Sequence, residues 1–155
     1  MVDARALRAL GPKDHASSSL APGTMSFECV NCHYLVREGK RYAGTENRNH
    51  CTKCLWSLHA DLRPGDRKAL CGGKMNPAGL TFKRVKKDKY GKEKVGELML
   101  VHQCVKCLEV SINRIAADDD PVEIMNLVNS GFSVEGISVL DEADRSEVRR
   151  QLFGV

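Results

Sequence analysis

The sequence predicts a small α+β domain of short β-hairpins and cysteine knuckles, followed by short C-terminal helices. Six of its seven cysteines form Cys-x-x-Cys pairs, at residues 29–32, 51–54 and 104–107. Alternating apolar residues precede the third pair, whereas a helical apolar period follows it. The 155-residue chain has only four Phe, three Tyr and one Trp, so burial of large side chains contributes little stability. We therefore expect the cysteines to help hold the fold together.

The N-terminal segment, residues 1–24, is rich in Ala, Arg and Ser and lacks a sustained apolar period. We expect it to be a disordered extension. The folded body is expected to span residues 25–120. Its first elements are a short apolar alternation over Tyr34–Val36, a polar loop over Arg37–Asn49 and a helical turn over Leu55–His59.

The clearest β signal lies in the middle of the body. Residues Leu80–Val85 alternate in polarity, Lys86–Glu93 form a charged linker, and Lys94–His102 read as a second strand. These segments predict a β-hairpin whose second arm leads into the third cysteine pair. A further alternation over residues 108–112 predicts another strand.

Residues 121–155 are expected to form an acidic helical tail. One helical face of the first segment is made of four apolar residues: Val122, Ile124, Met125 and Val128. A second short helix is expected over Asp141–Leu152. Residues 118–155 carry three basic and nine acidic side chains, whereas residues 25–117 carry eighteen basic and nine acidic ones. The tail could therefore dock on a protein partner or fold back onto the basic body.

The cysteine spacing is typical of metal ligands. Two residues between cysteines let both thiolates reach one tetrahedral ion from a single tight turn. Three pairs supply six thiolates, and two four-coordinate sites need eight ligands, so Cys71 and a histidine are expected to complete the second site. We assign the first site to Cys29, Cys32, Cys51 and Cys54, and the second to His59, Cys71, Cys104 and Cys107. These sets favour two Zn²⁺ ions and a zinc-ribbon-like fold.

Other assignments remain open on spacing alone. Any two of the three pairs could form the all-cysteine site. The histidines His33, His50 and His102 each adjoin a pair, and we expect them to support a ligand or to face solvent. A redox role would favour a pair at a helix start near a βαβ pattern, and an iron–sulfur cluster would favour a ferredoxin-like run of cysteines. Neither pattern occurs in the sequence.

Several motifs stand together in the body of the chain. They are Phe27 with the first cysteine pair, Arg48–His59, Asp61, Pro64–Arg67, Cys71–Met75, His102–Cys107 and Asn113–Ala116. Over roughly residues 26–120 this combination resembles the RNHCP-domain family, small bacterial zinc-binding proteins named for an Arg-Asn-His-Cys-Pro string. Thr52 stands here in place of the proline, and threonine can adopt the same turn geometry. The resemblance implies a metal-binding fold and leaves the activity unspecified.

The basic body favours a polyanionic partner, and we expect RNA or the ribosome to bind through the predicted hairpin. Tyr90 near the hairpin tip is a candidate for base stacking. Asn49 and Asn113 could add specific contacts. The candidate nucleic-acid contacts are Arg48, Lys83, Arg84, Lys86, Lys87, Lys89, Tyr90 and Arg114.

Two other classes of function are alternatives to RNA binding. The first is a metal-dependent nuclease or other hydrolase, because histidine, aspartate and asparagine side chains are common in the active sites of these enzymes. The candidates here are His50, His59, Asp61 and Asn113. Catalytic zinc needs an open coordination position, however, and both predicted sites are filled by protein ligands, which favours a role without catalysis. A protein–protein adaptor acting through the acidic tail is the other.

The sequence also bears on where the protein acts. Its N-terminus lacks the apolar core of a signal peptide, and no stretch approaches the ~20 apolar residues of a membrane span. An odd number of cysteines in metal-like pairs argues against a secreted disulfide scaffold. We therefore expect a cytoplasmic protein without membrane association.

Overall fold

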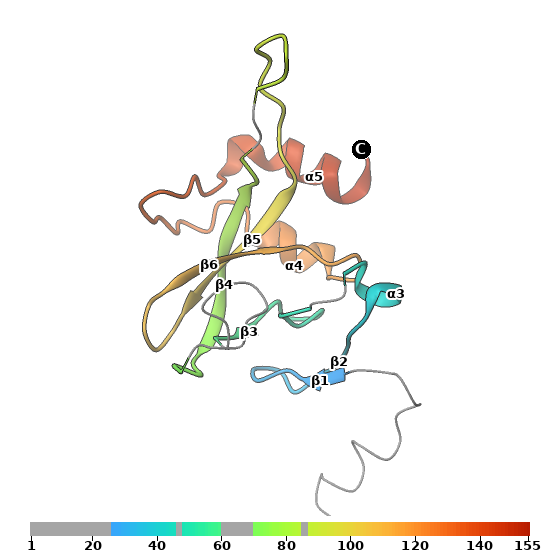
Figure 1. Ribbon diagram of the computed structural model, residues 1–155, viewed down its shortest axis with the longest axis vertical. Helices are drawn as coiled ribbons and strands as arrows, with labels where there is room; N and C mark the ends of the chain where they lie inside the picture. Colours follow the sequence, from blue (N-terminus) through green and yellow to red (C-terminus); the bar gives the residue numbers. More distant parts are fainter. Residues whose placement is uncertain (1–25, 46–47, 60–69, 85–86) are drawn as a thin grey trace, which may run out of the picture.

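The computed structural model describes residues 26–45, 48–59, 70–84 and 87–155. Within these ranges the chain forms a two-stranded and a four-stranded antiparallel sheet together with short helices (Figure 1). The predicted α+β class is confirmed. The predicted disordered extension, residues 1–24, lies outside the described residues.

The N-terminal part forms a small separate sheet. Strand β1 (Ser26–Glu28) pairs antiparallel with β2 (Leu35–Arg37), and the first cysteine pair lies in the turn between them. The predicted polar loop that follows contains one helical turn, α3 (Lys40–Ala43). This helix ends at Gly44, whose φ of 70° is in the left-handed region that glycine tolerates best.

The central sheet has the order β3-β4-β5-β6. Its strands are β3 (Ser57–Leu58), β4 (Lys74–Phe82), β5 (Leu98–Cys104) and β6 (Val110–Arg114). The prediction of a helical turn over Leu55–His59 is therefore wrong. This segment runs as an edge strand because its backbone pairs with the start of β4, a partner that lies beyond local sequence.

Strand β4 is longer than the predicted segment and starts well before Leu80. Its register against β5 shifts between Pro77 and Gly79. A proline and a glycine usually weaken a strand, but a bulge accommodates both without ending the ladder. Gly79 is also needed for packing, because a Cβ atom there would lie 2.8 Å from Val139 Cγ1.

The C-terminal helices begin at local capping signals. Helix α4 (Pro121–Asn126) starts after Asp120, whose carboxylate accepts a hydrogen bond from Val122 N at 2.9 Å. Asp141 starts a capping box that leads through the 3₁₀ turn η1 (Glu142–Asp144) into α5 (Arg145–Phe153). No helix in the described part of the chain is long and apolar enough to cross a membrane.

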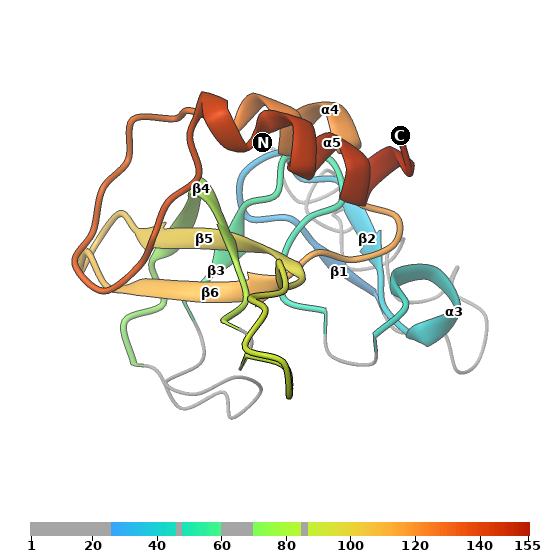
Figure 2. The same cartoon turned by 90° about the horizontal axis from the view of Figure 1, so that it is seen from above.

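Helices α4 and α5 lie next to each other over one face of the central sheet (Figure 2). The hydrophobic core between the helices and the sheet consists of Leu55, Leu80, Leu98, Leu100, Ile124, Val128, Leu140 and Val148. The acidic segment is thus packed into the same hydrophobic core as the basic sheet. One position of the predicted apolar face is wrong, since Val122 is 62% exposed in the first turn of the short α4.

Candidate metal centres

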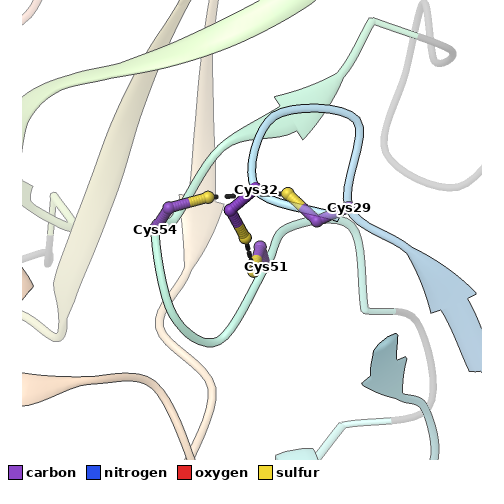
Figure 3. Close-up of side chains that lie close together, drawn as sticks. All are labelled: Cys29, Cys32, Cys51 and Cys54. Atoms are coloured by element: carbon purple, nitrogen blue, oxygen red, sulfur yellow. Dashed lines mark hydrogen bonds between the residues drawn. The ribbon is translucent and has the colours of Figure 1, made fainter. Parts of the chain in front are cut away.

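The first cluster joins the first two cysteine pairs. Cys29 and Cys32 lie in the turn after β1, and Cys51 and Cys54 lie in the turn before β3 (Figure 3). The Sγ atoms of Cys29 and Cys54 are 3.5 Å apart, and those of Cys32 and Cys51 are 3.6 Å apart. A tetrahedral zinc ion with Zn–S bonds of about 2.3 Å holds its sulfurs about 3.8 Å apart. The donor set and its spacing therefore fit a single tetrahedral ion.

The second cluster comprises His59, Cys71, Cys104 and Cys107, whose candidate ligand atoms lie within 4.8 Å of one another. Cys71 Sγ is 3.6 Å from Cys104 Sγ, and Cys107 Sγ is 3.3 Å from His59 Nδ1. The other ring nitrogen of His59 faces the Glu109 carboxylate at 3.4 Å. A carboxylate in this position orients a ligating imidazole and raises its basicity. The sequence spacing left the pairing open, and the structure brings the eight residues together in these two groups.

All three Cys-x-x-Cys turns have the same backbone geometry. In each, the first cysteine donates its N–H to the carbonyl oxygen five residues later, at 2.9 Å, 2.9 Å and 2.8 Å. The residue after the second cysteine donates back to the carbonyl of the first, at 3.0 Å in every case. That residue has a left-handed φ in each turn: 62° at His33, 63° at Leu55 and 65° at Leu108. A residue with a left-handed φ is usually glycine, and glycine is the signal by which a sequence indicates such a residue. None of these three residues is glycine, so the left-handed conformation could not be predicted from the sequence.

The surroundings favour a thiolate at some sulfurs and oppose it at others. Burial by itself raises the pKa of the Cys29 thiol, but N–H groups of Cys32 and Asn31 outweigh it and lower the pKa to about 7. The pKa of Cys104 falls to about 6 by the same balance, aided by His59. At Cys51 burial dominates and raises the pKa to about 12. Each cluster thus has a sulfur favoured as thiolate near neutral pH, the form that binds a metal ion.

Gly73 provides space for the second cluster, and its replacement is a sharp test of that site. A Cβ at this position would lie 2.7 Å from Cys104 Sγ and 3.3 Å from Cys71 Sγ. We expect Gly73→Ala to push these sulfurs apart and to lower the zinc content from two ions to one per chain, measured by native mass spectrometry. Gly72→Ala is the matched control, because no atom lies within 4 Å of its added Cβ. Despite backbone strain at a φ of 63°, that control should keep both ions. Equal zinc contents in the two variants would contradict the assignment.

Next to the first cluster lies a buried charged network. Arg48 is 1% exposed, and its guanidinium donates to Asp118 Oδ1 and to Asp119 Oδ1, each at 2.5 Å. Its Nε also donates to the His50 carbonyl at 2.9 Å. Because the Arg48 side chain is fully buried and each of its three nitrogens is bonded within the protein, it is not available to a phosphate at the surface. The prediction of Arg48 as a nucleic-acid contact is therefore wrong, and its role is to tie the first cluster to the segment before α4.

From Asp119 a chain of hydrogen bonds leads through the domain to His102 on β5. His50 donates from Nε2 to Asp119 Oδ2 at 2.7 Å and from Nδ1 to Asn49 Oδ1 at 2.8 Å. Asn49 Nδ2 then donates to Asn113 Oδ1 at 2.5 Å, and Asn113 Nδ2 donates to His102 Nδ1 at 2.9 Å. The chain ends where His102 Nε2 donates to a backbone carbonyl at 2.6 Å.

This chain fixes the orientation of the two buried histidines. Both ring nitrogens of His50 are engaged, Nε2 by the Asp119 carboxylate at 2.7 Å and Nδ1 by Asn49 Oδ1 at 2.8 Å. Burial lowers the pKa of His102 to about 4, so its ring is neutral at physiological pH. A neutral ring is needed here because Nδ1 accepts a hydrogen bond from Asn113 and therefore carries no proton. Neither ring belongs to a metal-ligand cluster. His33, by contrast, is exposed and pairs with Glu28 at 2.8 Å.

The remaining predicted contacts lie at the surface. The loop that joins β4 to β5 projects beyond the sheet and α5 (Figure 1). It carries the exposed side chains of Lys83, Arg84, Lys87, Lys89 and Tyr90. Arg114 is exposed on the edge strand β6, 3.5 Å from Glu97. Lys86 and Asp61 lie outside the described residues.

Comparison with known proteins identifies one relationship. The model of the RNHCP domain family matches residues 24–125. No curated protein and no solved structure matches the chain.

Proposed function

The chain belongs to the RNHCP domain family, and we propose that it is a two-zinc module whose β4–β5 hairpin binds RNA. The observation that carries the metal assignment is the pair of four-ligand clusters. The observation that supports the RNA assignment is the projecting basic loop between β4 and β5. Each half of the proposal has its own experimental test.

Zinc is the metal that suits both clusters best. Thiolates with at most one imidazole are soft ligands, and tetrahedral sets of this kind are typical of structural zinc. Four protein ligands saturate a tetrahedral ion and leave no position for water or substrate. The bound ions would therefore supply folding free energy, which a chain with few aromatic residues needs. Native mass spectrometry of the purified protein should show two zinc ions per chain.

A metal-dependent nuclease is less well supported by the same residues. His59 lies in a saturated ligand set, and both nitrogens of His50 are engaged within a buried network. A catalytic imidazole needs a free nitrogen that can reach the substrate. His50 and His59, the two histidines considered for catalysis, therefore have structural roles in this proposal.

The hairpin tip has the chemistry of a surface that binds single-stranded RNA. Lys87, Lys89 and Lys92 are exposed there, and Tyr90 is 78% exposed. Two backbone N–H groups donate to the Asp88 carboxylate, at 2.8 Å and 2.9 Å, which gives the tip a defined turn. Ammonium groups contact phosphates, while an exposed ring offers a stacking surface for a base.

Neutralising the tip tests the RNA half of the proposal. The triple variant Lys87→Ala, Lys89→Ala and Lys92→Ala should keep both zinc ions and its melting temperature, because these side chains are exposed. Its affinity for RNA should fall about equally for all sequences. The slope of log affinity against log salt should become shallower by about 2, as expected when three phosphate contacts are lost. Fluorescence anisotropy with labelled oligonucleotides at several salt concentrations measures both quantities.

A matched triple variant controls for net charge. Lys40→Ala, Lys53→Ala and Lys74→Ala removes the same charge from exposed positions on other elements. We expect a smaller loss of affinity and an unchanged salt slope in this control. Equal losses in the two triple variants would mean that the hairpin is not the binding surface.

A further inference from the structure

We propose that a pocket beside β6 receives an unpaired adenine base of the bound RNA. This inference rests on the proposed function, because it names what the same surface recognises. The pocket has a volume of about 260 Å³ and lies next to the buried hydrogen-bond chain. Asn49 and Asn113 are part of its polar lining, together with the buried Arg48 and His50, and Met99, Ile112 and Arg114 line it from the sheet.

The two amides of this lining are held in fixed orientations by buried groups. Asn49 accepts from His50, which is itself fixed by the Asp119 carboxylate. Asn113 donates to the buried His102 at 2.9 Å and to Ser111 Oγ at 3.2 Å. A side chain that is already ordered loses little conformational entropy when it binds a ligand. These amides are therefore pre-organised for recognition.

The Asn49 amide retains hydrogen-bonding capacity toward the pocket. A primary amide offers two N–H donors and two acceptor positions. Among the described residues, Asn49 uses one N–H to reach Asn113 and one acceptor position for His50. One donor and one acceptor position remain on a residue that is only half-buried. We assign adenine to this amide, because one donor and one acceptor can pair with its N7 and its N6 amino group together.

The walls suit the faces of a base. Met99 and Arg114 are cross-strand partners on β5 and β6, so their side chains leave the same face of the sheet. Ile112 lies on that face as well and is 40% exposed. Apolar side chains and a guanidinium plane can both cover an unstacked base. The Arg114 guanidinium is exposed and lies 3.5 Å from the Glu97 carboxylate, with which a phosphate would compete.

The pocket is continuous with the proposed RNA surface. A second hollow of about 280 Å³ shares Met99 and Ile112 with it and extends to Lys83 and Arg84 at the base of the hairpin. A strand held by the basic hairpin could therefore run along this side of the sheet and present one base at the edge strand β6, where Ile112 on one face and the amides on the other both line the pocket. The hairpin would supply affinity, and the pocket would supply base selectivity.

Homopolymers of RNA provide the direct test. Dissociation constants are measured by anisotropy for labelled adenosine, uridine and cytidine homopolymers of equal length at one salt concentration. We expect the adenosine homopolymer to bind roughly tenfold tighter than the others. Asn49→Asp replaces the N–H donor with an oxygen of similar shape and should abolish this preference. Asn126→Asp, the same change at an exposed site on α4, should preserve it.

A second variant keeps the test decisive if Asn49→Asp is unstable. Ile112→Ala changes only an exposed wall on an edge strand, and the adenosine preference should fall toward unity while both zinc ions are kept. Equal binding of all homopolymers by the native protein would overturn the pocket and leave RNA binding intact. A preference for another base would also overturn it, as would an adenosine preference that Ile112→Ala leaves unchanged. Binding of none of the homopolymers would overturn the RNA function as well.

Discussion

Replacing Cys51 by serine is expected to remove one zinc ion per chain and to abolish cooperative thermal unfolding. The Cys51 side chain is completely buried, and its sulfur lies 3.6 Å from that of Cys32. A structural zinc site contributes on the order of 10 kcal/mol to the folding of small peptides. A whole domain is usually stable by only about 5–15 kcal/mol. Loss of the first site therefore removes a free energy comparable with the stability of the entire fold.

The effect should spread beyond the turn that carries the mutation. Cys51 packs with Cys29 and Val36 in the small N-terminal core, and Leu55 just after the turn belongs to the main core. The two sheets are thus connected through this segment. Native mass spectrometry counts the zinc ions, and circular dichroism on heating follows the transition.

Lys53→Ser is the matched control for this experiment. It places the same new residue in the same turn, but Lys53 is exposed and is not a candidate ligand. This variant should keep two zinc ions and a transition close to that of the native protein. Two zinc ions in Cys51→Ser would show that Cys51 is not a ligand and would reopen the pairing of the cysteines.

Replacing Asp119 by alanine is expected to destabilise the protein by about 3–5 kcal/mol, the usual cost of leaving a buried charge without its partner. The Asp119 carboxylate is fully buried and accepts from Arg48, from His50 and from the backbone N–H of Ala116. Its removal leaves the fully buried Arg48 guanidinium with Asp118 as its remaining carboxylate and takes from the buried His50 ring the acceptor of its Nε2. Urea unfolding of the zinc-loaded protein gives the change in free energy.

Asp118→Ala tests whether burial causes this cost. Asp118 contacts the same guanidinium at the same 2.5 Å, yet its side chain is 33% exposed. Water can replace the lost carboxylate at such a site, so the change in unfolding free energy should stay near ~1 kcal/mol. Equal decreases in unfolding free energy in the two variants would show that the cost of removing a carboxylate does not depend on its burial.

Much of the architecture followed from local sequence patterns. The hairpin of β4 and β5, the strand β6 and the helices α4 and α5 were predicted from apolar periodicity. Their boundaries were less accurate, since β4 begins at Lys74 rather than at Leu80 and a bulge accommodates Pro77 and Gly79 within it. The strand β3 was missed for a related reason, since two residues acquire strand character only through the partner strand.

For the candidate metal centres, spacing was informative because a Cys-x-x-Cys turn is a local structure that depends on four residues. The grouping of these turns into two clusters is a tertiary property. In particular, the structure places His59 and Cys71 beside the third pair, across β3 and β4. The role of the eight residues as zinc ligands stays a prediction, to be decided by the zinc counts above.

The sequence alone thus determined the class of fold, the family and the residues suited to bind metal, because each depends on composition, periodicity or short motifs. Only the tertiary structure showed which polar residues of the motifs are buried and which contacts they make. Arg48 reads as a surface cation, but its partner Asp119 is 71 residues away in the chain and encloses it. His50 and His102 likewise become parts of one buried chain through Asn49 and Asn113. Contacts between distant segments leave no local signal in a sequence, and these contacts shape the pocket for which we propose adenine.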